Sequence, residues 1–148
     1  MAKEHDLFRV GTMILVLNEK GQVLLGKRKN TFAAGEYGTP SGHMEHGEDF
    51  VTTAGRELFE ETGLVVSKDA LLLFAISNYI IQDWTHQYVT FDFVTTVSSS
   101  AELTTESEKC EGWEWHDLDK LPSPLHYPAE RSIKQYREYQ KNKKLLVS

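Results

Sequence analysis

Residues 42–64, GHMEHGEDFVTTAGRELFEETGL, constrain the fold of this chain more than any other segment. Residues 49–62 contain no proline, and Phe50, Ala54 and Leu58 recur at every fourth position. That spacing places the apolar side chains on one face of a helix, and a glycine follows at the position where many helices end. The segment therefore predicts an amphipathic helix over residues 49–62.

Acidic residues crowd the apolar side of this helix. Glu57 and Glu61 are one turn apart and fall on or beside the apolar stripe, and Glu60 lies one step further round. Carboxylates carried toward a core cost free energy unless they are compensated, and like charges at i and i+4 repel. A solvated acidic face is the plain alternative, but it fits poorly with acids at the apolar edge.

A hard divalent cation would hold such carboxylates together through oxygen ligands. We expect Mg²⁺, because it binds through few carboxylates plus the phosphates of a substrate. Arg56 lies away from the stripe, where it can pair with Glu60 at i+4. Spacing alone allows it equally to be an ordinary exposed arginine.

The 148 residues carry 16 Lys and Arg against 22 Asp and Glu, giving a net charge of −6. The length predicts one domain over residues 1–148. The acidic balance argues against nucleic acid as a partner, because no general basic field is present. A polyanionic ligand would need local positive charge from a few side chains or from a bound cation.

Cys110 is the one cysteine, so no intrachain disulfide can form and a cytoplasmic location is the default expectation. We expect no membrane anchoring, because no apolar run approaches the ~20 residues that span a bilayer. The sequence leaves the oligomeric state open, a homodimer included.

The remaining segments predict an α/β domain with a mixed sheet between helices. Residues 8–17 and 23–25 are strand-like and predict a hairpin, and residues 29–47 are rich in glycine and predict a long loop. Further strands are expected at 71–81, 86–97 and 112–115, and a last helix at about 129–143. Residues 82–85 would join two of these strands.

The spacing within residues 42–64 resembles the Nudix box at every fixed position. Gly42 is followed after five residues by Glu48, and after seven more by Arg56-Glu57-Leu58. One residue then separates these from Glu60-Glu61, and one more from Gly63-Leu64. This pattern of nine positions implies a Nudix hydrolase with an α/β/α sandwich, using Mg²⁺ or Mn²⁺ to cleave a nucleoside diphosphate linked to another moiety.

The resemblance also implies roles for residues of the box. Glu57, Glu60 and Glu61 match the metal-binding carboxylates, and the backbone carbonyl of Ser41 matches a further metal ligand. Glu48 would support them through water or Arg56. Ser41 itself departs from the family, which usually has a second glycine at that position, while Gly42 is retained.

Hydrolysis of a phosphoanhydride also needs a base and a group that binds phosphate. Glu57 and Glu60 are candidate bases within the helix, and Glu108 is a candidate base or extra metal ligand from the acidic stretch 106–111. An ordinary acidic loop is the alternative for Glu108. Arg28 is the expected phosphate clamp, because a guanidinium binds phosphate oxygens in a bidentate manner.

Aromatic side chains are expected to enclose the base of a nucleotide. The candidate substrate-binding residues are Tyr37, Tyr79 and Trp113, and His43 is a candidate phosphate contact. Further aromatic candidates are Phe32, Trp84 and Trp115. Some of these rings would be ordinary core, and His43 could be a loop histidine with no such role.

Segments outside the box resemble the small Nudix enzymes that hydrolyse nucleoside triphosphates to monophosphates, the group that sanitises oxidised nucleotides. These segments are residues 23–29, 77–79, 86–91 and 112–115. The leading hypothesis is therefore a metal-dependent nucleoside triphosphate pyrophosphatase with a free nucleotide as substrate. Hydrolysis of nucleotide sugars or ADP-ribose is the first alternative, although residues 64–120 lack the downstream proline of the ADP-ribose group. A non-catalytic nucleotide-sensing module is the second.

Overall fold

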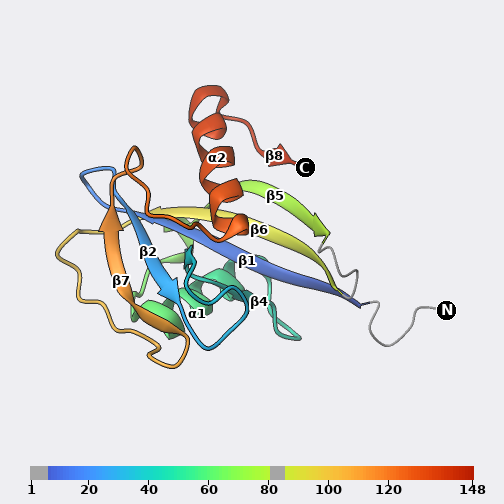
Figure 1. Cartoon of the computed structure of the whole chain (residues 1–148). Helices are drawn as coiled ribbons and strands as arrows, with labels where there is room; N and C mark the ends of the chain where they lie inside the picture. Colours follow the sequence, from blue (N-terminus) through green and yellow to red (C-terminus); the bar gives the residue numbers. More distant parts are fainter. Residues whose placement is uncertain (1–6, 81–85) are drawn as a thin grey trace.

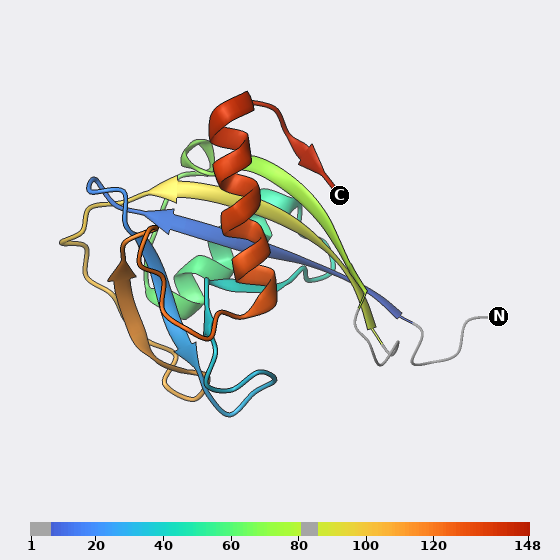
Figure 2. The ribbon, with the colours of Figure 1, turned by 45° about the horizontal axis from the view of Figure 1, so that its top comes forward.

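The computed structural model describes residues 7–80 and 86–148, which form a mixed eight-stranded sheet with one helix on each face (Figures 1 and 2). The strands are β1 (Leu7–Leu17), β2 (Val23–Arg28), β3 (Tyr37–Gly38), β4 (Ser41–His43), β5 (Leu72–Ile80), β6 (His86–Thr96), β7 (Cys110–His116) and β8 (Leu146–Val147). The helices are α1 (Phe50–Thr62) and α2 (Tyr127–Asn142), with a short 3₁₀ helix at Lys68–Ala70. The expected α/β/α sandwich is confirmed.

The sheet divides where β2 leaves β1. The order is β3-β2-β1-β6-β5-β8, with β4 paired to β1 and β7 paired to β2. The β1–β6 pair is parallel over the full length of β1, whereas β1 meets β2 in register only at Leu17 and Val23. Beyond that point the two strands diverge (Figure 1), and β4 takes the place beside β1 by pairing Gly11 with His43. This divergence leaves room for the end of β2 to face α1.

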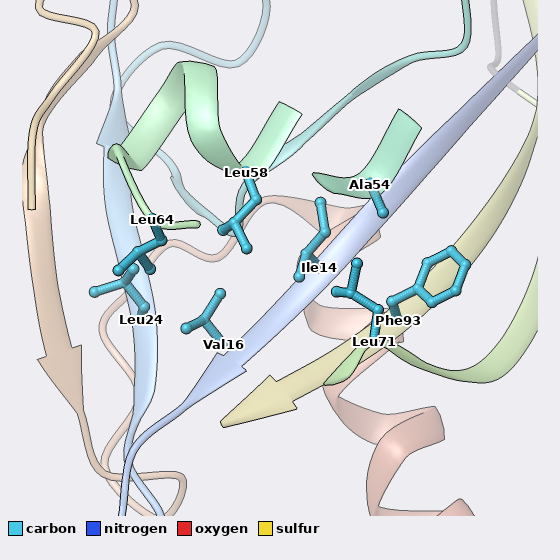
Figure 3. Packing of buried hydrophobic residues seen from close by; sticks show 8 residues of the cluster. All are labelled: Ile14, Val16, Leu24, Ala54, Leu58, Leu64, Leu71 and Phe93. Atoms are coloured by element: carbon cyan, nitrogen blue, oxygen red, sulfur yellow. The ribbon is translucent and has the colours of Figure 1, made fainter. Parts of the chain in front are cut away.

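Helix α1 forms as the sequence predicts, because both of its ends carry strong local signals. The carboxylate of Asp49 accepts a hydrogen bond from the backbone N–H of Thr52 at 2.8 Å, and Gly63 ends the helix at φ 77°. Ala54 and Leu58 are fully buried against the sheet. Figure 3 shows them packed with Ile14, Val16, Leu24, Leu64, Leu71 and Phe93.

Helix α2 covers the opposite face of the sheet (Figure 2). Its Ile133 packs into a second core cluster that includes Leu15, Leu25 and Phe74. Within residues 7–80 and 86–148, no helix has the length and hydropathy needed to cross a membrane.

Several boundaries differ from the sequence prediction. The long loop expected at 29–47 contains the short strands β3 and β4, and β8 was not expected. These strands have two or three residues each, so they show no periodicity and depend on the pairing offered by β1, β2 and β5. The predicted connection 82–85 lies outside the described residues.

Candidate active site

A cleft of about 390 Å³ lies between α1, the end of β2 and the segment that precedes β7. Strands β2, β3 and β4 supply one part of its lining and α1 supplies Glu57 and Glu61. The lining residues are Gly26, Arg28, Thr31, Gly38, Thr39, Ser41, Gly42, His43, Glu45, Glu57, Glu61, Glu106, Lys109, Cys110 and Trp113. Five sequence-predicted residues outside α1 thus line the same cleft as the carboxylates of α1: Arg28, Ser41, Gly42, His43 and Trp113.

Glu57 and Glu61 approach the backbone of β4 closely. The backbone N–H of Ser41 donates to Oε2 of Glu61 at 2.9 Å. A Cβ atom at position 42 would lie 2.0 Å from Cδ of Glu57, so only glycine leaves room for that carboxylate. The box glycine therefore has a steric function here, and Ser41 holds Glu61 through its backbone.

Both carboxyl groups have raised pKa values. Burial is the main cause for Glu61, whose pKa rises to about 8, and the charges of Glu57 and Glu106 add to the effect. Burial also raises the pKa of Glu57, against the lowering effect of Arg56. These neighbouring, incompletely compensated acids are the feature that a bound cation would stabilise.

Arg56 hydrogen-bonds to three carboxylates beside the cleft and forms an ion pair with a fourth, that of Glu45, at 3.7 Å. It donates to both oxygens of Glu48, from Nε at 2.7 Å and from one terminal nitrogen at 2.9 Å. Its other terminal nitrogen lies 2.8 Å from Oε1 of Glu57 and 3.2 Å from Oε2 of Glu60. These bonds hold the pKa of Glu48 down at about 2. The pairing with Glu60 follows the i, i+4 prediction, and the backbone carbonyl of His43 accepts a further bond at 2.9 Å.

The donor set fits a hard divalent cation by its chemistry, because carboxylate and carbonyl oxygens are the ligands such ions take. In the described residues, however, no three acidic, histidine or cysteine side chains converge as a preformed site. Arg56 explains part of this, since it draws Glu57 and Glu60 toward its own guanidinium. The side chain of Glu60 is 48% exposed and does not line the cleft.

Arg28 reaches the cleft from the end of β2. Its Nε donates to the backbone carbonyl of Phe32 at 3.0 Å, and burial lowers its pKa. His43 also lines the cleft, with its ring stacked on that of Tyr88 at 5.6 Å between centroids.

Two predicted aromatic residues lie elsewhere. Tyr37 packs against the α2-side core and sets its ring edge to face with His116 at 5.9 Å. Tyr79 is buried beneath α2, beside Tyr127 and under the guanidinium of Arg131. Neither ring lines the cleft that holds the carboxylates, because strand pairing rather than residue type sets the face that each ring occupies, and their contact with a nucleotide base stays a prediction.

The other aromatic candidates divide in the same way. Trp113 does line the cleft, and its indole N–H donates to the backbone carbonyl of Glu61 at 2.9 Å. Trp115 packs on the α1-side core, and Phe32 is 73% exposed on the loop after β2. Trp84 lies outside the described residues.

The acidic stretch before β7 supplies a different residue from the one predicted. Glu106 lines the cleft, whereas Glu108 does not. The backbone carbonyl of Glu108 instead accepts a bond from the side-chain amide of Asn30 at 3.2 Å. Lys109 also lines the cleft. Sequence reasoning missed both Glu106 and Lys109, because the direction in which their side chains point depends on the hydrogen bonds that hold this loop to the residues after β2.

The family model of the NUDIX domain matches residues 7–137. The chain belongs to the NUDIX domain family. Its curated relatives act on different substrates by name. The NAD-capped RNA hydrolase NudC of Pseudomonas aeruginosa is 31% identical over 130 residues, covering 87% of this chain but 43% of that protein. The chain thus spans less than half the length of NudC.

Two further relatives differ again in their named activity. An RNA pyrophosphohydrolase of Actinobacillus pleuropneumoniae is 30% identical, covering 76% of this chain and 61% of the relative. An oxidized purine nucleoside triphosphate hydrolase of Danio rerio is also 30% identical, covering 75% and 67%. Relatives of similar identity in the NUDIX domain family thus carry different named activities.

Solved structures agree on the fold. The MutT NUDIX hydrolase from Burkholderia pseudomallei superposes with a TM-score of 0.79 at 27% identity, covering 87% of this chain and 98% of that one. The NUDIX domain of Shewanella oneidensis NrtR, solved as a complex with ADP ribose, has a TM-score of 0.74 at 20% identity, covering 90% and 89%. At that identity the second comparison supports the fold alone.

Proposed function

We propose that this Nudix hydrolase cleaves nucleoside triphosphates to a nucleoside monophosphate and pyrophosphate with the help of Mg²⁺ or Mn²⁺. The observation that carries the proposal is the pair of partly buried carboxylates, Glu57 and Glu61, facing the same cleft as Arg28. Carboxylates that share a cleft with an arginine able to bind phosphate suit a polyphosphate that binds together with a divalent metal ion. The resemblance of the flanking segments to triphosphate enzymes, and the Danio rerio relative, favour triphosphates among possible substrates.

Glu57 and Glu61, with the carbonyl of Ser41, are the residues we expect to hold the cation. When bound, a divalent cation supplies positive charge at the phosphoryl oxygens and lowers the pKa of water. Glu60 belongs to the proposed set as well. Because it is half exposed and paired with Arg56, its replacement should cost less activity than that of Glu57 or Glu61.

The remaining roles in the proposal fall to residues of the cleft and its support. The guanidinium of Arg28 binds the phosphate oxygens and orients the chain of phosphates for in-line attack by water. Glu106 takes the proton of that water, in place of Glu108, because Glu106 lines the cleft. Arg56 and Glu48 position Glu57, and the Ser41 N–H positions Glu61.

The proposal is tested with a panel of nucleoside triphosphates, nucleotide sugars and ADP-ribose at fixed Mg²⁺. We expect turnover of triphosphates that is abolished by a chelator and lowered about 100-fold or more in Glu61→Gln, since an amide replaces a charged ligand. Turnover confined to ADP-ribose or nucleotide sugars would contradict the substrate assignment. Nucleotide binding without any turnover would favour the sensing alternative.

A further inference from the structure

Lys109 lines the cleft but has no role in the proposed chemistry. Among the described residues that line the cleft, Arg28 and Lys109 are the two lysine or arginine side chains. Arg28 is tied by its Nε to the carbonyl of Phe32. Within the described part of the chain, the ammonium of Lys109 makes no hydrogen bond to a backbone carbonyl, and it lies 3.2 Å from Oε1 of Glu106.

A turn fixes the backbone of Lys109 to the strand that carries Arg28. The backbone N–H of Lys109 donates to the carbonyl of Glu106 at 3.0 Å, which closes the turn. The carbonyl of Lys109 accepts from the N–H of Lys29 at 3.0 Å, one residue beyond β2. The backbone of Lys109 is therefore anchored next to Arg28, while its side chain is 68% exposed and able to move.

The charges of the cleft act on this ammonium. Glu106 is the main cause of the raised pKa of Lys109, and Glu61 and Glu57 contribute to it. Lys109 in turn lowers the pKa values of Glu57 and Glu61. The ammonium of Lys109 thus interacts electrostatically with Glu57 and Glu61, the carboxylates proposed to lie at the phosphates. Glu61 also interacts with the guanidinium of Arg28.

An exposed ion pair such as that of Lys109 and Glu106 contributes little to stability, so Lys109 can leave Glu106 for another anion at little cost in free energy. A triphosphate carries several negative charges close together, so it competes well with the single carboxylate of Glu106 for the ammonium. Because the cleft is otherwise acidic, a polyphosphate gains from every cation placed at its edge.

The geometry points to Lys109 as a second phosphate-binding residue of the cleft, which exchanges Glu106 for a phosphate oxygen when a nucleoside triphosphate binds. This inference rests on the proposed function and extends it. The exchange also frees the carboxylate of Glu106 as substrate arrives, so that a base paired with lysine in the free enzyme becomes available in the complex.

The test is equilibrium binding of a triphosphate analogue with a non-hydrolysable α–β bridge, compared with the matching monophosphate, in the presence of Mg²⁺. Lys109→Met should weaken binding of the triphosphate about tenfold, as expected for one charge-assisted contact, and that of the monophosphate less than about twofold. Lys109→Arg should restore most of the affinity, because it keeps the charge. The difference between wild type and Lys109→Met should shrink at high salt.

Lys27→Met is the matched control. Lys27 also pairs with a glutamate on the neighbouring segment, Glu111, at 3.8 Å, but it does not line the cleft. We expect its triphosphate affinity to stay within about twofold of wild type, with both variants melting near the wild-type temperature.

Three outcomes can be distinguished. If the wild type binds and hydrolyses triphosphates, and Lys109→Met and Lys27→Met both bind the triphosphate as tightly as wild type, the role of Lys109 alone is overturned. Equal weakening for monophosphate and triphosphate would also overturn it, because a structural defect would then explain the loss. A wild type that neither binds nor hydrolyses triphosphates would overturn the proposed function and this inference with it.

Discussion

Replacing Glu61 with glutamine should stabilise the protein in the absence of divalent metal, and more so at high pH. The pKa of Glu61 is raised to about 8 from an ordinary value of 4.5, chiefly by burial. Below pH 4.5 the group is protonated in both the folded and the unfolded chain, so it contributes nothing. As pH rises from 4.5 to about 8 the unfolded chain releases the proton first, and the free energy of unfolding falls.

The shift from 4.5 to about 8 corresponds to about 5 kcal/mol of unfavourable free energy for the ionised carboxylate well above pH 8. Part of this is relieved because the side chain keeps some contact with solvent and because Glu57 can take up a proton instead. We therefore expect Glu61→Gln to be about 2 kcal/mol more stable than wild type at pH 9 and nearly equal to it at pH 4.5. The amide oxygen of glutamine can still accept the bond from Ser41.

The assay is urea unfolding in the presence of a chelator at pH 4.5, 7 and 9, read by circular dichroism. Glu138→Gln, at an exposed position of α2 that does not line the cleft, serves as the control and should follow wild type at each pH. Added Mg²⁺ should stabilise wild type and have less effect on Glu61→Gln, because a ligand that binds only the folded state raises its stability. A Glu61→Gln protein less stable than wild type at pH 9 without metal would refute the reasoning.

Three further substitutions test other parts of the account. Gly42→Ala would place a Cβ 2.0 Å from Cδ of Glu57, so it should displace that carboxylate and lower kcat about 100-fold while the protein still folds, as measured by turnover and circular dichroism. Trp113→Phe removes the indole N–H that donates a hydrogen bond to the Glu61 carbonyl, so kcat should fall about tenfold for every nucleotide. A change in the order of kcat/KM among nucleotides with different bases would instead assign the ring to base recognition. Asp92→Asn removes a fully buried carboxyl whose pKa burial raises to about 6, so unfolding at pH 8 should cost about 2 kcal/mol more than in wild type, with activity unchanged; equal stability at pH 8 would contradict this.

The helix that carries the acids was predictable because its signals are local. The cap at Asp49, the apolar spacing and the terminal Gly63 all lie within one continuous segment, and the structure begins and ends α1 beside them. The i, i+4 pairing of Arg56 and Glu60 was accessible for the same reason.

Residues outside the helix were harder to place because their direction depends on distant partners. Glu106 rather than Glu108 lines the cleft, since the turn is pinned by bonds to residues just after β2. Tyr37 and Tyr79 match an aromatic wall by type, yet β3 and β5 direct both rings into the α2 side of the fold. The close approach of Glu57 to Gly42 likewise depends on β4 pairing with β1, which no local pattern in the glycine-rich segment indicates.

The position of the broken bond tests the central claim most directly. Wild-type protein is incubated with a nucleoside triphosphate and Mg²⁺, and the products are separated by chromatography, with Glu61→Gln as the inactive comparison. The account predicts equal amounts of nucleoside monophosphate and pyrophosphate, in a reaction that stops when a chelator is added. Release of nucleoside diphosphate and orthophosphate, or undiminished turnover by Glu61→Gln, would contradict it.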